Sequence, residues 1–135
     1  MAVLPGGDLL LTSKGRSGRI DLFRLRAAAW QYGGVVEAEL VGTLPITPTP
    51  GTGRLVTGMA TDQSGTVMVV RTYRDLFRFS RQGDGTLEPV AVCDILGREP
   101  QGEGVALSPD GSMLLTSERG LFPSGTIYRV HCDGR

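Results

Sequence analysis

The clearest pattern along the chain is a short apolar block that follows a glycine and recurs three times. Each block begins with a glycine and a small polar residue, continues with four mostly apolar residues and ends in polar ones. The three copies occupy residues 7–14, 65–72 and 111–118. An apolar run of this length is typical of a strand buried on both faces. The recurrence indicates a chain built from structural repeats.

Two further kinds of segment accompany each block. After it, apolar and polar residues alternate, and an aromatic residue, an arginine and an apolar residue follow in that order, at 20–25, 75–79 and 126–130. Alternation with period two predicts strands. Before the second and third glycines, the segments 58–62 and 104–108 predict another strand, joined to the block by hairpin-turn residues such as Pro109 and Asp110.

A fourth strand is expected at 34–41 and at 89–95. Helix is not expected, because the best candidate, 23–32, has no N-cap and follows a strand pattern directly. We interpret that segment as the end of a strand followed by an irregular loop. The stretch 43–54 is rich in Pro, Thr and Gly and is interpreted as a surface loop.

These elements predict an all-β fold made of four-stranded antiparallel blades of a β-propeller. The chain is then a single domain, 1–135, that forms a partial propeller of about two and a half blades. Blade 1 covers about 2–42, blade 2 about 55–97 and an incomplete blade 3 about 101–131.

An open arc of blades leaves apolar strands exposed and strand edges unpaired, whereas closed propellers have about 4–8 blades. Three explanations stay open: the chain self-associates, with a second copy supplying the missing outer strand; a separate partner chain completes the propeller; or the reading frame is truncated. The formal net charge is zero, with 14 basic and 14 acidic residues, which tolerates self-association.

The composition also narrows the partners and the location. A balanced charge with dispersed arginines argues against a nucleic-acid partner. The apolar runs are strand-sized, far below the roughly 18 residues that span a bilayer, so no membrane partner is expected. The first residues lack the features of a signal peptide, and we expect the chain as given to stay in the cytoplasm.

The two cysteines, Cys93 and Cys132, are 39 residues apart. With one histidine, His131, and no CxxC motif, they supply too few ligands for a zinc site. We expect two free, mostly buried thiols, because a disulfide needs an oxidising compartment that nothing in the sequence indicates.

Several segments together resemble a known family. They are Leu-Thr-Ser-Lys at 11–14, Val-Thr-Gly-Met-Ala at 56–60, Val-Arg-Thr-Tyr at 70–73, Pro-Gln-Gly-Glu-Gly-Val-Ala at 100–106 and Thr-Ser-Glu at 116–118. In this order they resemble the C-terminal half of bacterial phytase-like propellers, whose domain is described as having an esterase-like activity of phytase. The resemblance implies a truncated or split form of a longer propeller, whose full-length relatives are often exported.

Candidate site residues follow from the blade geometry. The end of the second strand and the start of the first strand of a blade lie at the same mouth of the central channel. The residues placed there are Lys14, Arg71, Tyr73, Gln101, Glu103 and Glu118. Glu103 and Glu118 are oxygen donors of the kind that suits Ca²⁺ or Mg²⁺, so a calcium cofactor is a hypothesis. Alternatively, Arg71 and Lys14 hold a small anionic ligand, or these groups satisfy one another and the loop backbone.

The other polar residues predict little chemistry. No Gly-x-Ser-x-Gly motif is present, and a catalytic triad would have to use His131 near the chain end. Aspartates beside glycines, such as Asp62, Asp84 and Asp110, are expected to bond turn backbone. The preferred function is therefore a non-catalytic propeller module, or a truncated propeller, that acts by binding or self-assembly. The alternative is a phytase-like esterase or phosphoesterase fragment with a metal or anion site at the channel mouth.

Overall fold

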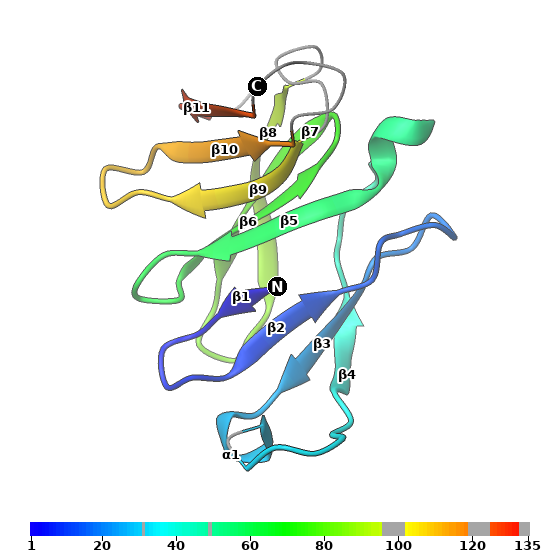
Figure 1. Cartoon of the computed structure of the whole chain (residues 1–135), viewed down its shortest axis with the longest axis vertical. Helices are drawn as coiled ribbons and strands as arrows, with labels where there is room; N and C mark the ends of the chain where they lie inside the picture. Colours follow the sequence, from blue (N-terminus) through cyan, green and yellow to red (C-terminus); the bar gives the residue numbers. More distant parts are fainter. Residues whose placement is uncertain (31, 49, 96–101, 119–124, 133–135) are drawn as a thin grey trace.

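The computed structural model describes residues 1–30, 32–48, 50–95, 102–118 and 125–132. In these residues the chain is all-β apart from two short helical turns, and its strands form three antiparallel sheets (Figure 1). The predicted fold class is confirmed at this level. Within the described residues no helix is long and apolar enough to cross a bilayer.

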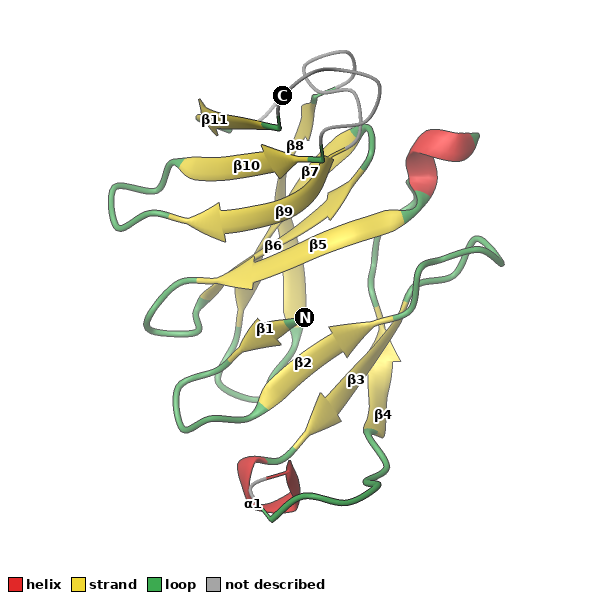
Figure 2. Ribbon diagram, viewed as in Figure 1, coloured by secondary structure: helices red, strands yellow, loops and turns green. Residues whose placement is uncertain are grey.

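Each sheet is formed by consecutive segments of the chain, so that every strand pairs with the next one along the sequence (Figure 2). Sheet A has the strand order β1 (Ala2–Val3), β2 (Leu9–Thr12), β3 (Asp21–Leu25) and β4 (Glu39–Thr43). A four-residue helix, α1 (Ala27–Trp30), follows β3, and a 3-10 turn, η1 (Thr52–Arg54), leads into the second sheet.

Sheet B contains β5 (Val56–Thr61), β6 (Val67–Thr72), β7 (Asp75–Arg81) and β8 (Leu87–Asp94) in that order. Sheet C contains β9 (Gly102–Leu107), β10 (Met113–Ser117) and β11 (Thr126–Val130), with β10 in the middle. The first strands of the three sheets are neighbours, since β5 contacts both β1 and β9, and the sheets spread away from this row (Figure 1).

The three repeated glycines occupy equivalent turns between the first and second strands of their sheets. Gly7, Gly65 and Gly111 have φ angles of 88°, 71° and 81°, a region that favours glycine. In each turn the glycine amide donates to the carbonyl oxygen three residues earlier, at 2.9, 3.1 and 2.9 Å. The turn in sheet B is one residue longer than the turn in sheet A. In sheet B the Asp62 amide donates to the Val67 carbonyl oxygen, whereas in sheet A the Leu4 amide donates to the Asp8 carbonyl oxygen.

Cross-strand pairing shows that the three sheets repeat the same two faces. On one face the first three strands carry an alanine, an aliphatic residue and an arginine side by side, which we call the arginine face. Its rows are Ala2–Leu10–Arg24, Ala60–Val69–Arg78 and Ala106–Leu114–Arg129. The opposite face carries an aromatic residue on the third strand, which we call the aromatic face. Its rows are Leu11–Phe23, Met59–Val70–Phe77 and Val105–Leu115–Tyr128.

The sheets stack so that the arginine face of one packs against the aromatic face of the next. Leu10 of sheet A and Phe77 of sheet B belong to one cluster of buried residues. Val69 of sheet B and Leu115 of sheet C belong to a second cluster. Sheet B is therefore covered on both faces, and Met68, Val69 and Val70 on β6 are fully buried.

A disulfide links sheet B to sheet C. It joins Cys93 on β8 to Cys132, which follows β11, with the two Cα atoms 5.8 Å apart. The prediction of two free thiols is therefore wrong. The stacking of sheets B and C brings the end of β8 beside the end of β11, a long-range proximity that the 39-residue separation does not reveal.

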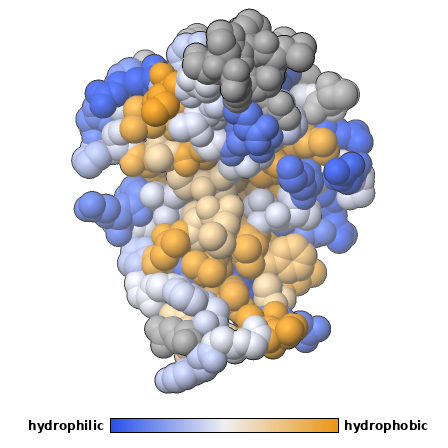
Figure 3. Space-filling view, in the orientation of Figure 1, coloured by the Kyte–Doolittle hydropathy of each residue, from blue (hydrophilic) through white to orange (hydrophobic). Residues whose placement is uncertain are grey.

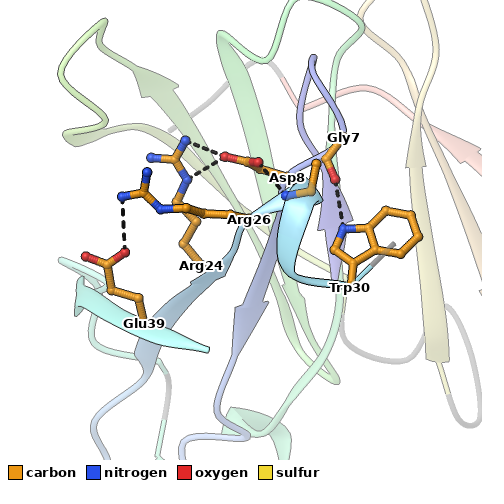
Figure 4. A network of polar contacts seen from close by, with 7 residues as sticks. Gly7, Asp8, Arg24, Arg26, Trp30 and Glu39 are labelled. Carbon is orange, nitrogen blue, oxygen red and sulfur yellow. Dashed lines mark hydrogen bonds and ion pairs between the residues drawn. The ribbon is translucent and has the colours of Figure 1, made fainter. Parts of the chain in front are cut away.

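The region after β3 also differs from the prediction. The helix α1 does have a capping group, but it comes from a distant turn: the Ala27 amide donates to Asp8 Oδ1 at 2.8 Å (Figure 4). Trp30 Nε1 donates to the Gly7 carbonyl oxygen at 3.2 Å. The fourth strand of sheet A begins at Glu39, where its pairing with Arg24 of β3 begins, rather than at residue 34. Gly34 itself has a positive φ angle of 93°, outside the extended region.

Candidate functional site

Arg71, a predicted site residue, is buried where β6 ends, with 1% of its surface exposed. Its Nη1 donates to the carbonyl oxygens of Gly104 at 2.7 Å and Thr116 at 3.1 Å. Those two residues face each other across β9 and β10. The guanidinium thus attaches sheet B to the backbone of sheet C, and charge-assisted hydrogen bonds of this kind are among the stronger ones in proteins.

Tyr73 and Glu103 meet close to this contact. The Tyr73 hydroxyl donates to Glu103 Oε1 at 2.8 Å, and Glu103 is partly buried near the start of β9. Glycines allow the close approach of the neighbouring strands. A Cβ atom on Gly58 would lie 3.1 Å from the Glu103 carbonyl oxygen, and one on Gly104 would lie 2.2 Å from Thr116 Oγ1.

Lys14 and Glu118 lie just beyond the ends of β2 and β10, and both are exposed. The arrows of β2 and β10 point to the same side of the molecule, where β5 and β9 begin (Figure 2). The strand ends that were expected to share one edge therefore do so. The Lys14 carbonyl oxygen accepts a hydrogen bond from the Val56 amide at 3.1 Å, which connects the end of β2 to the start of β5.

The structure thus brings Arg71, Tyr73 and Glu103 together and places Lys14 and Glu118 at the same edge as exposed groups. Gln101 lies outside the described residues. Among the residues that are described, no group of three or more His, Cys, Asp or Glu side chains is placed to hold a metal ion. The calcium hypothesis remains a prediction that depends on Glu103 and Glu118.

Sequence reasoning missed a buried carboxylate beside this edge. Asp75 begins β7, and 5% of its surface is exposed. Its amide donates to Thr72 Oγ1 at 2.8 Å, while its Oδ2 has no hydrogen-bond partner among the described residues. Its signal in the sequence was weak, because an aspartate at the start of a strand after a tight turn is ordinarily solvated.

Turn aspartates behave as predicted. Asp84 Oδ1 accepts the Thr86 amide at 2.8 Å, and Asp110 Oδ1 accepts the Ser112 amide at 3.0 Å. The Thr86 amide stabilises the charged carboxylate of Asp84 and lowers its pKa. The pKa of Asp110 is lowered first by the hydrogen bond from the Ser112 hydroxyl, at 2.6 Å, and then by that from the Ser112 amide. Burial alone would raise the pKa of Asp62, but hydrogen bonds led by that from Ser64 lower it overall.

A separate polar network lies in sheet A (Figure 4). Arg24 on β3 donates from Nε to Asp8 Oδ2 at 2.7 Å, and its Nη2 contacts the same oxygen. The hydrogen bonds from the Ala27 amide and the Arg24 guanidinium lower the pKa of Asp8. In sheet C, Arg129 Nη1 lies 3.7 Å from Asp110 Oδ2. Both arginines of the arginine faces of sheets A and C thus pair with an aspartate from the first turn of their sheet.

Two hollows lie away from Arg71, Tyr73 and Glu103. One, of 370 Å³, lies between sheet A and the β7–β8 turn and is lined by Leu22, Arg24, Arg81 and Asp84, among others. The second, of 450 Å³, lies between the first turns of sheets B and C and is lined by residues that include Asp62, Arg78, Leu107 and Ser108. Neither contains one of the predicted site residues.

Comparison with known proteins gives no match for this chain among protein-family models, curated proteins or solved structures.

Proposed function

We propose that this chain is a non-catalytic β-propeller module that acts by association through the uncovered faces of its first and last sheets. Four-stranded antiparallel sheets formed by consecutive hairpins, stacked face to face with their first strands in a row, are the arrangement of propeller blades. The stack of sheets A, B and C supports this interpretation.

The observation that carries the proposal is the apolar surface of the outer faces. The aromatic face of sheet A has Leu11 and Phe23 partly exposed, beside Leu40, which is 57% exposed. Orange side chains gather over the lower half of the molecule in Figure 3, where Figure 1 places this sheet. The arginine face of sheet C exposes Ala106 and Ile127 and leaves Leu114 partly exposed.

Such surfaces favour association for a general physical reason. Burying apolar surface contributes roughly 25 cal/mol per Å², and contiguous apolar patches on soluble proteins commonly mark interaction sites. The face of sheet B that is equivalent to the uncovered face of sheet A is completely buried by its neighbour: Val70 and Phe77 are 0% and 4% exposed. In the described part of the chain, the aromatic face of sheet A and the arginine face of sheet C have no neighbouring sheet that covers them in this way.

A second candidate is the phytase-like esterase or phosphoesterase, and the Tyr73–Glu103 hydrogen bond beside Arg71 is the observation in its favour. It has less support, because Arg71 Nη1 already donates to two carbonyl oxygens instead of pointing to a ligand. Assays with p-nitrophenyl esters and phosphates, with and without Ca²⁺, test it. Turnover that requires Ca²⁺ and is lost in Glu118→Gln would establish it over the association module.

The disulfide bears on the location. Structural disulfides persist in oxidising compartments and are rare in the cytoplasm. We therefore place the working protein where the Cys93–Cys132 bond can form, in contrast to the expectation from the N-terminal residues. Thiol labelling of the protein taken from its native cells tests this, and two free thiols would contradict it.

Sedimentation equilibrium tests the association itself. We expect the oxidised chain to associate at micromolar concentration, with an average mass above the 14.4 kDa of one chain. A single 14.4 kDa species across the concentration range, unfolding cooperatively, would contradict the proposal.

A further inference from the structure

We infer that the surface covering the outer faces is a second copy of this chain, packed head to tail, so that two chains form a closed ring of six sheets. In each junction the arginine face of sheet C of one copy packs on the aromatic face of sheet A of the other. This inference rests on the proposed association and specifies its partner.

The first argument is that the two internal junctions follow one rule. Between sheets A and B, the arginine face, with Leu10, packs on the aromatic face, with Phe77. Between sheets B and C, the arginine face, with Val69, packs on the aromatic face, with Leu115. The direction of stacking is the same in both junctions.

The second argument is that the two uncovered faces are the two halves of such a junction. Sheet A exposes an aromatic face, and sheet C exposes an arginine face. The equivalents of Leu114 are Leu10 and Val69, which are 4% and 0% exposed inside the stack. The equivalents of Leu11 are Val70 and Leu115, which are both 0% exposed. A second copy therefore presents, at each open end, the surface that this chain already uses internally.

The charges on the two faces are compatible with burial. The aromatic face of sheet A carries Leu9, Leu11, Phe23 and Leu25 along β2 and β3. Asp21, at the start of β3 on the same face, is paired with Arg19, whose Nε lies 2.8 Å from Asp21 Oδ1. The cation of the opposing face, Arg129, already has Asp110 at 3.7 Å. In the junction between sheets A and B the equivalent Arg24 is also paired, with Asp8, and 38% of its side chain stays exposed, so this arginine position keeps contact with solvent when the face is covered. A paired charge is much less costly to bury than a lone one.

The third argument is closure. A head-to-tail contact is heterologous, and it generates either a ring or an open filament. Each chain supplies three sheets, so two copies supply six, which lies within the range of about 4–8 blades in closed propellers. The first strands lie side by side in one row, with β5 between β1 and β9, and the sheets spread from it (Figure 1).

Two surface variants test the inference. Leu11→Glu places a charge on the aromatic face of sheet A, and Leu114→Glu places one on the arginine face of sheet C. We expect the wild-type mass to be about 29 kDa, twice the 14.4 kDa chain, and each variant alone to be 14.4 kDa. An equimolar mixture has one intact pair of faces, so it should recover a 29 kDa complex with weaker affinity. Val90→Glu, on the exposed part of β8, is the matched control and should keep the wild-type mass.

Different failures have different meanings. A monomeric wild type overturns both the proposed function and this inference. An associating wild type whose mixed variants do not recover the complex overturns the head-to-tail junction but leaves association standing. If only one of the two variants loses the dimer, the contact is isologous, with the same face used by both copies, and the head-to-tail junction is overturned. If a glutamate variant does not fold by circular dichroism, Leu11→Ser and Leu114→Ser replace the pair with the same expected masses.

Discussion

The guanidinium of Arg71 on β6 donates a hydrogen bond to the carbonyl oxygen of Gly104 on β9, 2.7 Å away, across the junction between sheets B and C. A sheet junction that otherwise depends on apolar packing therefore contains a buried cation held by backbone. In the other two sheets the equivalent position on the second strand is a threonine, Thr12 or Thr116. The contact is thus a local feature of this junction rather than part of the repeat.

Replacing Arg71 with methionine is expected to lower the free energy of unfolding by about 2–4 kcal/mol, because two carbonyl oxygens lose a charged donor. Urea unfolding followed by circular dichroism measures the change. Arg26→Met is the control, since its exposed ion pair with Glu39 should contribute less than about 1 kcal/mol. Equal effects of the two substitutions would show that Arg71 does not join the sheets.

The Tyr73–Glu103 contact can be measured by a double-mutant cycle. Tyr73→Phe removes the hydroxyl that donates to Glu103 Oε1, and Glu103→Gln removes the charge of the acceptor. Because the two groups touch, the free energies of unfolding should be non-additive, with a coupling of about 0.5–1.5 kcal/mol. Additive effects of the two substitutions would mean that the hydrogen bond is absent in solution.

The Cys93–Cys132 disulfide should contribute substantially to stability. It closes a loop of 39 residues, for which the chain-entropy relation gives about 4 kcal/mol. Unfolding in urea with and without a reductant should show a loss of that size. The variant with both cysteines replaced by alanine should unfold like the reduced protein and should not respond to reductant. A wild-type midpoint that reductant leaves unchanged would contradict the linkage.

Acid should weaken the Asp8 network. The hydrogen bonds from the Ala27 amide and Arg24 hold the pKa of Asp8 below its ordinary value, so the folded state favours the charged carboxylate. The resulting stability is present above the unfolded pKa of about 3.9 and is lost as the pH falls through the lower folded value. In Asp8→Asn, unfolding free energy should therefore fall less steeply than in the wild type below about pH 5. If the unfolding free energies of the wild type and Asp8→Asn fall in parallel with pH, the Asp8 carboxylate does not contribute to the acid sensitivity.

The strands and the antiparallel sheets that they form were largely predictable, because they depend on local signals. The glycines at 7, 65 and 111 require turns with positive φ, and the apolar blocks behind them form the buried second strands. Period-two alternation located the third strands. Each of these signals lies within a few residues of the structure that it determines.

The remaining features depend on contacts between distant segments. The cap of α1 comes from Asp8, 19 residues before Ala27, so no local N-cap could be recognised. The disulfide depends on the stacking of sheets B and C. Arg71 was correctly placed at a strand end, yet its partners are backbone carbonyl oxygens, which no side-chain motif marks. Periodicity identifies the strands but not which groups meet across a sheet junction.

Hydroxyl-radical footprinting of the aromatic face of sheet A tests the central claim most directly. In the associated protein we expect oxidation of Phe23 and Leu11 to fall several-fold relative to a dilute, dissociated sample. Tyr32, which is 88% exposed in the loop after α1, should be labelled equally in both samples. Equal labelling of Phe23 in the two samples would show that association leaves this face uncovered, and would contradict the account.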